Sequence, residues 1–387
     1  AEPTPIPEDD DPLDFPTEDP VEDPIPSTDP IVVTPPVTDP IVLPPVIDPL
    51  VLPPVVVPPV VVPVDPNAKL TIKVSGRQLL VDGKAFTIKG VCYNPVPKGA
   101  GELSGTLFSN PTAAHLVALE QDFKLMQEAG INTIRTYSVI ENAKVLALLN
   151  KYGLFVIVPV MNVHTTTDKE VKRIVNLLKN HRSTLMWQVG NEWNYNLLYG
   201  GWDYAKTAPL VKNAGTIIKA TDSSHPVMTN WGEIPSKAIV DEFSMFDIWG
   251  LNIYRSKSFD DSFSKWKAVS TKPMFIGEYG ADAFNALTNR EDTNSQGIAT
   301  EALTKEIMAN LSATSSDKAA LGGTIFEWND EWWKDQKGTQ ATHDNGGIAP
   351  GGGPYPDGTF NEEWWGVVDI DRNPRPAYNI LKALWKN

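Results

Sequence analysis

Short apolar runs that recur from residue 69 onward constrain the fold of this chain more than any other feature. Each run is rich in β-branched and aromatic residues, and helical periodicity or a polar loop separates it from the next. The runs cover Phe86–Tyr93, Thr133–Tyr137, Phe155–Met161, Leu185–Val189, Val227–Trp231, Ile248–Tyr254, Met274–Tyr279 and Gly323–Trp328. We expect helices over residues 112–129, 141–152, 167–180, 205–220, 235–243, 259–269 and 296–312, with a final helix over Pro376–Trp385. Near-continuous apolar strands that alternate with helices indicate a parallel sheet covered on both faces.

The number of strand–helix units favours closure of that sheet. Eight such units in about 300 residues are typical of a (β/α)₈ TIM barrel, and an open doubly wound sheet is the alternative. No run is followed by a Gly-x-Gly-x-x-Gly loop, and the glycine-rich residues 346–353 lack the Lys-Ser/Thr ending of a phosphate loop. Ahead of the barrel, Leu70–Val74 and Gln78–Val81 flank Ser75-Gly76 and predict a short β-hairpin.

Residues 1–66 have a composition that excludes a packed core. They contain 21 of the 34 prolines and 14 of the 48 acidic residues, but no Lys or Arg. Proline fixes φ and removes a hydrogen-bond donor, so this segment is predicted to be a disordered, extended stalk in front of a catalytic domain over residues 67–387. Such a stalk suits tethering of the barrel to a surface. No apolar run is long enough for a transmembrane helix.

Charge and cysteine content narrow the partners and the compartment. The net charge of −15 belongs almost entirely to the stalk, because residues 67–387 carry 34 acidic and 33 basic side chains. A near-neutral body argues against nucleic acid as a partner. Cys92 is the single cysteine and excludes an internal disulfide framework. The chain starts at Ala1, which fits either a mature exported chain or a trimmed one. We expect a secreted or cell-envelope protein.

Two glutamates follow strands that would face each other across the mouth of a barrel. Functional groups of this fold gather at the C-terminal ends of the strands, where the sequence places Glu192 and Glu278. Retaining glycoside hydrolysis requires two carboxyl groups about 5 Å apart, one protonated and one ionised. Arg135 and Tyr254 also lie at strand ends and are predicted to support Glu278. The carboxylates of Glu233, Glu327, Asp330 and Glu331 are rival candidates, which we interpret as substrate contacts or loop charges.

Other polar and aromatic residues at strand ends are candidates for sugar contacts. Aromatic faces stack on the C–H faces of pyranose rings, so tryptophans near a barrel mouth indicate a carbohydrate cleft. The candidates are Tyr93, Asn162, His164, Trp193, Trp231 and Trp328. Cys92 is interpreted as a buried apolar residue rather than a nucleophile. The five histidines lack metal-ligand spacing, so neither a metal site nor a cofactor is predicted.

Several motifs resemble those of the clan A glycoside hydrolases, which are (β/α)₈ retaining β-glycosidases. Val-Gly-Asn-Glu-Trp (189–193) is similar to their strand-four motif, and Asn-Thr-Ile-Arg-Thr-Tyr (132–137) to their strand-two arginine motif. Ile-Gly-Glu-Tyr-Gly-Ala-Asp (276–282) resembles the nucleophile motif of the family 2 barrel. Phe-Glu-Trp-Asn (326–329) and the segment 368–378 are also similar to family 2. Ile-Lys-Gly-Val-Cys-Tyr (88–93) and Glu-Tyr-Gly (278–280) equally resemble the β-1,3-glucanosyltransferases of family 72.

The resemblance covers residues 67–387 and implies a role for individual residues. It implies that Glu192 is the general acid/base and Glu278 the nucleophile. It further implies that Asn191 contacts the 2-hydroxyl of the sugar, that Arg135 and Tyr254 support the nucleophile, and that Trp328 forms the floor of the subsite that holds the cleaved sugar.

The sequence therefore predicts an enzyme that cleaves a β-linked polysaccharide or oligosaccharide by double displacement. A β-glucan, in particular a β-1,3-glucan, is the first expectation, with galactan and mannan as alternatives. Water or a second sugar can resolve a glycosyl-enzyme, so a hydrolase and a transglycosylase are both open. A sugar-binding protein without catalytic activity is the alternative of a different class.

Overall fold

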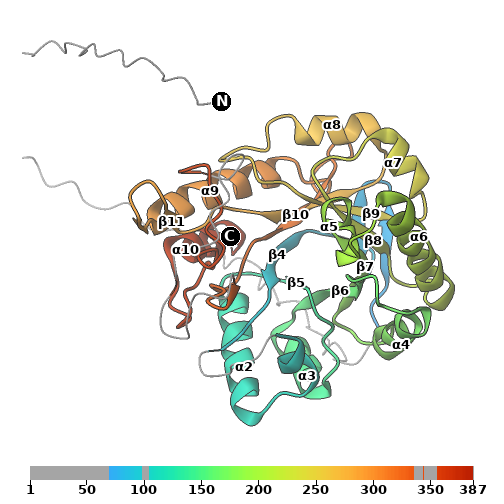
Figure 1. The fold of residues 1–387 in the computed structure, drawn as a ribbon, viewed down its shortest axis with the longest axis horizontal. Coiled ribbons are helices and arrows are strands. Elements are labelled where there is room, and N and C mark those ends of the chain that lie inside the picture. The colour runs from blue at the N-terminus through green and yellow to red at the C-terminus, as the bar shows by residue number, and fades with distance from the viewer. Residues whose placement is uncertain (1–68, 98–103, 335–342, 344–354, 387) are drawn as a thin grey trace, which may run out of the picture. The chain divides into compact units, whose positions relative to one another are not determined.

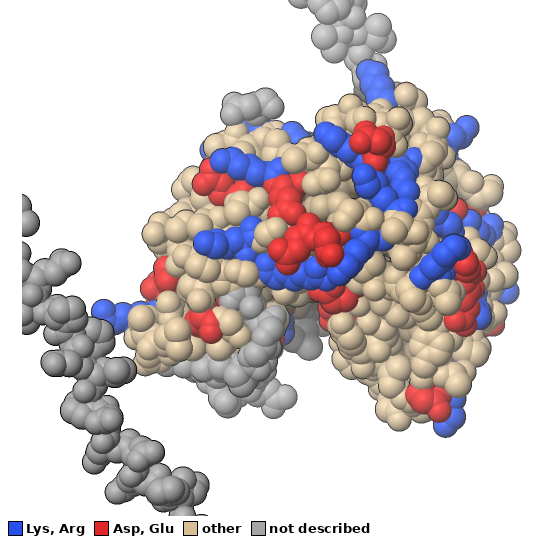
Figure 2. All heavy atoms as spheres, turned by 90° about the horizontal axis from the view of Figure 1, so that it is seen from above, with Lys and Arg blue, Asp and Glu red and all other residues tan. Residues whose placement is uncertain are grey.

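The computed structural model describes residues 69–97, 104–334, 343 and 355–386. The predicted stalk, residues 1–66, lies outside these residues. None of the helices in the described part of the chain is both long and apolar enough to cross a membrane. On the face that Figure 2 displays, acidic and basic side chains are interspersed over the described surface.

Eight parallel strands close into a barrel at the centre of the molecule (Figure 1). They are β4 (Ile88–Tyr93), β5 (Thr133–Thr136), β6 (Phe155–Met161), β7 (Thr184–Asn191), β8 (Val227–Gly232), β9 (Ile248–Asn252), β10 (Met274–Tyr279) and β13 (Ala320–Ile325). Each strand pairs with its neighbours along the chain, and β13 pairs with both β10 and β4 to complete the circle. The predicted (β/α)₈ architecture is confirmed.

Helices surround the barrel in Figure 1. They are α1 (Ser104–Ser109), α2 (Ala113–Glu128), α3 (Ala143–Tyr152), α4 (Asp168–Leu178), α5 (Trp193–Asn196), α6 (Tyr204–Thr221), α7 (Lys237–Glu242), α8 (Ser262–Val269), α9 (Thr293–Ala309) and α10 (Pro376–Trp385), with a 3₁₀ turn, η1, over Leu197–Tyr199. Side-chain caps begin many of them. Thr112 accepts a hydrogen bond from the backbone of His115, and Thr167 accepts one from Glu170. Gly153 ends α3 in the left-handed conformation that favours glycine.

A three-stranded antiparallel sheet precedes the barrel, where the sequence predicted a two-stranded hairpin. Its strands are β1 (Ile72–Ser75), β2 (Gln78–Val81) and β3 (Lys84–Phe86). Phe86 thus belongs to this sheet and not to the first barrel strand, because the chain turns again at Asp82-Gly83 and pairs β3 with β2. A second short ribbon, β11 (Phe284–Asn285) and β12 (Arg290–Glu291), follows β10.

The sheet β1–β3 plugs the end of the barrel at which the strands begin. Ile72 and Leu79 are buried in one cluster with Ile157, Met228 and Phe275, all near the starts of barrel strands. The C-terminal ends of the strands are thereby left as the open end.

The last barrel strand begins and ends three residues earlier than predicted, at Ala320–Ile325. Gly322 has φ +129°, and a Cβ there would lie 2.0 Å from the carbonyl oxygen of Ile88. Only glycine permits this close approach of β13 to β4. Because glycines interrupt the apolar run, the start of this strand is not visible in the pattern of apolar residues. Phe326 and Trp328 therefore lie beyond the strand end, in the loop that follows it.

Replacing Leu79 with Ala is expected to reduce the free energy of unfolding by about 2–4 kcal/mol, because the change leaves a cavity in the plug. Urea denaturation measures it. Lys73→Ala, on the exposed face of the same sheet, is the matched control and should change stability by less than about 0.5 kcal/mol. Equal stability losses in the two variants would show that the sheet does not plug the barrel.

Candidate active site

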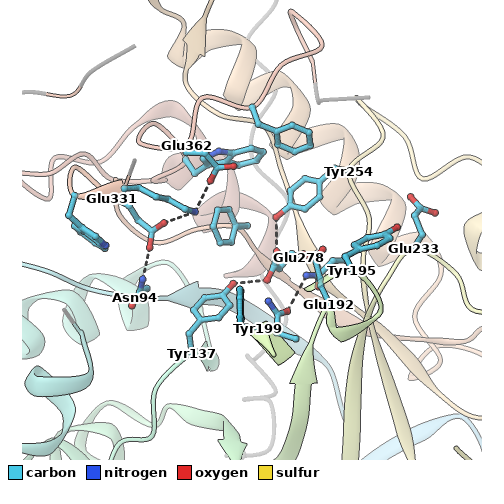
Figure 3. A pocket seen from close by; sticks show the side chains of 17 residues that line it. Asn94, Tyr137, Glu192, Tyr195, Tyr199, Glu233, Tyr254, Glu278, Glu331 and Glu362 are labelled. Carbon is cyan, nitrogen blue, oxygen red and sulfur yellow. Dashed lines mark hydrogen bonds and ion pairs between the residues drawn. The ribbon is translucent and has the colours of Figure 1, made fainter. Parts of the chain in front are cut away.

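A pocket of about 670 Å³ opens where the barrel strands end (Figure 3). Its walls combine carboxylates, amides and aromatic rings. The lining residues are Asn94, Tyr137, Asn191, Glu192, Tyr195, Tyr199, Glu233, Asn252, Tyr254, Glu278, Phe326, Glu331, Trp333, Lys334, Phe360, Glu362 and Trp365. Asn191 ends β7 and Asn252 ends β9, so the barrel itself positions the floor.

Glu278, on β10, lies at the centre of this floor and is 6% exposed. Its Oε1 accepts hydrogen bonds from Arg135 Nη1 and from the Tyr137 hydroxyl, both at 2.7 Å. Its Oε2 accepts one from the Tyr254 hydroxyl at 2.9 Å. Burial, followed by nearby negative charge, raises the pKa of Tyr137 and of Tyr254 well above the ordinary value, so both phenols remain donors. Three donors therefore hold both carboxylate oxygens of Glu278.

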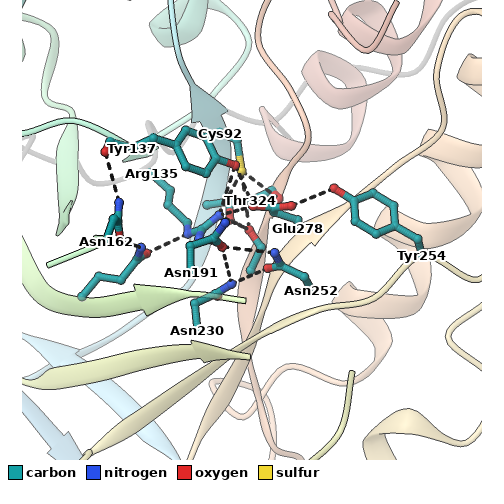
Figure 4. Close-up of polar contacts among 12 residues, drawn as sticks. Cys92, Arg135, Tyr137, Asn162, Asn191, Asn230, Asn252, Tyr254, Glu278 and Thr324 are labelled. Carbon is teal, nitrogen blue, oxygen red and sulfur yellow. Dashed lines mark hydrogen bonds and ion pairs between the residues drawn. The ribbon is translucent and has the colours of Figure 1, made fainter. Parts of the chain in front are cut away.

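Arg135, on β5, is fully buried directly beneath the pocket (Figure 4). Besides the ion pair with Glu278, its Nε donates to Gln188 Oε1 at 2.8 Å and its Nη2 to Asn191 Oδ1 at 2.5 Å. A buried charge is tolerated only when it is paired and hydrogen-bonded. The guanidinium meets this condition and fixes the orientation of residues on β7 and β10 at once.

An amide cluster continues this network across the barrel. Asn191 Oδ1 also accepts from Asn230 Nδ2 at 2.9 Å and from Asn252 Nδ2 at 3.2 Å. Gly277 makes room for the cluster, since a Cβ at that position would lie 2.1 Å from Asn230 Oδ1. The glycine that precedes Glu278 is therefore a packing requirement of the site.

Glu192 follows β7 directly and has a left-handed backbone, with φ 47° and ψ 33°. Its side chain is half-buried on the pocket wall. Burial, and next the negative charge of Glu278, raise the pKa of Glu192 to about 7, against the opposing effects of a hydrogen bond from Asn252 and the charge of Arg135. The site thus holds a carboxyl group that is substantially protonated at neutral pH beside a second carboxylate.

The structure brings together five of the residues that the sequence singled out. Glu192, Glu278, Asn191 and Tyr254 line the pocket, and Arg135 supports it from below. Arg135, Asn191 and Glu278 come from three different strands, and Glu192 and Tyr254 follow the ends of β7 and β9, as the barrel geometry predicts.

Four aromatic candidates lie in the core and do not line the pocket, which corrects the expectation of sugar contacts. Tyr93 donates to Asp122 at 3.0 Å, and Trp193 donates to Thr229 at 2.9 Å. Trp231 packs against Trp193, with ring centroids 4.8 Å apart. Trp328 is fully buried against Tyr378 of α10, with centroids 6.2 Å apart. Their rings fill the space between the barrel and the surrounding segments. Position near a strand end does not by itself tell whether a ring packs there or lines the mouth of the barrel.

Asn162 and His164, after β6, also lie outside the pocket lining. Asn162 donates to the carbonyl of Tyr137 at 3.1 Å and accepts from Gln188 at 3.4 Å, so it lies behind the wall and not on it. The ring of His164 packs edge-on against Trp202, with centroids 4.9 Å apart. Both side chains support the wall from outside.

Several lining residues were not among the sequence candidates. Tyr137 could have been found, because it lies two positions after Arg135 at the same strand end. Trp365 lines the pocket beside Tyr254, with ring centroids 5.3 Å apart. It comes from the loop before α10, which the sequence alone does not place beside Tyr254. Tyr195 and Tyr199 line the outer wall and are 62% and 67% exposed.

Cys92 lies beneath the pocket and is fully buried. Burial raises the pKa of its thiol to about 11, which keeps it in the unreactive thiol form. Within the described ranges, no three His, Cys, Asp or Glu side chains are grouped so that they could hold a metal ion.

Comparison with known families places the chain among carbohydrate-active proteins. The profile described as "Glycosyl hydrolases family 2, TIM barrel domain" matches residues 160–387, more than half of the chain. The profile described as "Glucanosyltransferase" matches residues 63–199.

Individual relatives are distant. The chain is 28% identical to the β-glucuronidase of Rattus norvegicus over 56% of this chain and 34% of that protein, so it spans about a third of that relative's length. It is 23% identical to a 1,3-β-glucanosyltransferase of Aspergillus fumigatus over 73% of this chain and 62% of the relative. The solved β-glucuronidase of Bacteroides uniformis matches with a TM-score of 0.60 at 17% identity, over 82% of this chain and 37% of that one. The structural likeness establishes a shared barrel fold.

The carboxyl group of Glu192 is expected to titrate with a midpoint near pH 7, measured by ¹³C NMR of labelled glutamate side chains. Glu278→Gln should lower this midpoint toward the ordinary glutamate value, because it removes the negative charge that opposes ionisation of Glu192. Glu301→Gln, a solvent-exposed change on α9, is the control and should leave the midpoint unchanged. A wild-type midpoint below about 5 would contradict this picture of the site.

Proposed function

Because the chain belongs to the glycosyl hydrolases of family 2, whose TIM barrel domain it carries, we propose that it is a retaining β-glycosidase. Its substrate is a β-linked polysaccharide or oligosaccharide, and the reaction is a double displacement with Glu278 as nucleophile and Glu192 as general acid/base. One observation carries the proposal. Two carboxyl groups share one pocket in different environments: three donors hold Glu278, and Glu192 lies half-buried beside the charge of Glu278.

In the first step, a carboxylate oxygen of Glu278 attacks the anomeric carbon while Glu192 transfers its proton to the glycosidic oxygen. The C–O bond to the leaving sugar breaks, and a glycosyl ester forms on Glu278. Arg135, Tyr137 and Tyr254 orient the nucleophile before the attack and stabilise it when it leaves again. Asn191, oriented by Arg135, is in position to bind the 2-hydroxyl of the sugar.

In the second step, the ionised Glu192 removes a proton from an acceptor hydroxyl, which attacks the anomeric carbon and releases Glu278. Water as acceptor completes hydrolysis. A sugar hydroxyl as acceptor gives transglycosylation, an alternative favoured by the match of residues 63–199 to the glucanosyltransferase profile.

A β-glucan is the proposed substrate, with β-1,3-glucan first. The likeness to a fungal 1,3-β-glucanosyltransferase supports this choice. The exposed rings of Tyr195 and Tyr199 on the outer wall offer stacking surfaces for further units of a chain. Action on a wall or matrix polysaccharide would take place outside the cytoplasm, in keeping with a secreted or envelope protein whose residues 1–66 serve as a stalk.

Glu278→Gln is expected to lower kcat on a cleaved glycan by about 10³-fold or more, because the amide cannot form the glycosyl ester.

Glu192→Gln should lower kcat by about 10²–10⁴-fold on sugars but far less on aryl glycosides whose leaving group needs no proton. The activity of the wild type on glycans whose leaving sugar needs a proton should decline as pH rises through about 7, because Glu192 then loses the proton that it donates. A panel of β-glucans, galactans, mannans and xylans provides the substrates.

The stereochemistry of the first product, read by ¹H NMR, distinguishes the mechanisms. Retention of the β-anomer is expected, and an inverted product would exclude double displacement. Glu301→Gln, far from the pocket on α9, is the control for both glutamine variants. If the wild type binds these glycans but cleaves none, the chain is a sugar-binding protein and the proposal fails.

Tyr199→Ala is expected to raise KM for long oligosaccharides by about 5- to 100-fold while leaving kcat/KM for a small aryl glycoside nearly unchanged, because the ring lies on the outer wall. Leu287→Ala removes another exposed apolar side chain, from the loop between β11 and β12, and is the control. If Tyr199→Ala changes kcat/KM equally for short and long substrates, Tyr199 does not stack on further sugar units.

A further inference from the structure

The charges that line the pocket are almost all negative. Among the described lining residues, five are glutamates and one is basic: Glu192, Glu233, Glu278, Glu331, Glu362 and Lys334. In Figure 3, Glu331 and Glu362 lie on one side of Glu278, and Glu192 and Glu233 on the other. Since Glu192 is substantially protonated, an anionic sugar would meet like charge from Glu331 and Glu362 on one side of the nucleophile and from Glu233 on the other.

Lys334 is already engaged by two of these glutamates. Its Nζ lies 2.8 Å from Glu331 Oε2 and 2.7 Å from Glu362 Oε2, with the ring of Phe326 centred 4.9 Å away. An ammonium group has three hydrogens, and two carboxylates and an aromatic face occupy its directions. We call Glu331, Lys334 and Glu362 the carboxylate–lysine cluster.

The cluster is anchored by the fold. The side chain of Glu331 is 4% exposed, and its Oε1 accepts from Asn94 Nδ2 at 2.5 Å. Burial lowers the pKa of Lys334, but the charges of Glu331, Glu362 and Glu327 outweigh it and raise that pKa well above the ordinary value. Lys334 therefore stays charged, and the two carboxylates of Glu331 and Glu362 already exceed its single positive charge.

The other cations near the pocket are also committed. Arg135 is fully buried beneath the floor and binds Glu278. Arg255 pairs with Glu233 at the edge and also lies 3.6 Å from Asp261. Arg135, Arg255 and Lys334 thus each face at least one carboxylate.

Building on the proposed function, we propose that the carboxylate–lysine cluster makes this cleft selective for uncharged sugars and against uronic acids. A uronate would have to displace Glu331 or Glu362 from Lys334, or add a further negative charge to the cleft. Either change leaves a carboxylate desolvated without its partner, and such like-charge contacts are a means of rejecting a ligand. This specificity separates the chain from the relatives that are named β-glucuronidases.

The test compares each neutral substrate with its C6-carboxylate counterpart, using the full chain. Aryl β-glucoside and β-glucuronide form one pair, aryl β-galactoside and β-galacturonide a second, and a β-glucan before and after C6 oxidation a third. We expect kcat/KM for the neutral member to exceed that for the uronate by about tenfold or more. An equal or higher value for the uronate overturns the inference while the proposed function stands. If no substrate of any pair or of the glycan panel is cleaved, the proposed function fails, and the inference fails with it.

Two variants identify the cluster as the cause. Glu362→Gln, which removes the more exposed carboxylate, should raise the uronate-to-neutral ratio of kcat/KM roughly fivefold, because it leaves Lys334 less fully balanced. Glu301→Gln, which breaks a lysine–glutamate pair on α9, is the matched control and should leave the ratio unchanged.

Lys334→Met distinguishes rejection from recognition. If Lys334 leaves its glutamates to bind a sugar carboxylate, this variant will lower kcat/KM on uronates by about tenfold or more relative to the neutral substrates, and the inference is wrong. We expect a relative loss on uronates of less than about threefold, because the variant only adds to a negative charge that already rejects them. Because the wild-type comparison and Lys334→Met do not depend on the folding of Glu362→Gln, the inference remains falsifiable without that variant.

Discussion

The buried ion pair between Arg135 and Glu278 is the interaction on which the rest of the site depends. Both groups are nearly or fully withdrawn from solvent, and an uncompensated charge at either position would cost several kcal/mol. The remaining donors of Arg135 bind Gln188 and Asn191, so the pair also sets the position of β7 relative to β10. The charge of Glu278 in turn helps to keep Glu192 protonated. One electrostatic arrangement thus holds both carboxyl groups in the environments that the proposed mechanism requires.

The barrel accommodates this polar centre by separating it from the apolar core. The sheet β1–β3 and the starts of the strands form an apolar plug at one end, while amides and charges occupy the other. Glycines within the strands allow this arrangement, because Gly277 leaves space for Asn230 and Gly322 lets β13 approach β4. Strand β10 therefore carries Glu278, Glu192 follows directly after β7, and loops carry many of the residues around them.

In the proposed function, those loops determine the choice of substrate. The segment after β13 carries Glu331 and Lys334, and the segment before α10 carries Glu362. The segment after β7 carries Tyr195 and Tyr199. Under our proposal, the charge of the outer pocket disfavours a uronate. A shared fold and a shared carboxylate pair are consistent with different sugars, since binding groups can change without disturbing the ion pair beneath them.

The sequence by itself determined the barrel, the pair Glu192 and Glu278, and their support by Arg135 and Tyr254, because each of these follows from strand periodicity and from the rule that parallel strands end on one face. It failed for Trp328 and Trp193, since an aromatic residue near a strand end can point into the core as readily as into the mouth. It also could not place Trp365 beside Tyr254 or identify the partners of Lys334. Those contacts join loops far apart in the chain, and only tertiary packing decides which of them meet and with what net charge.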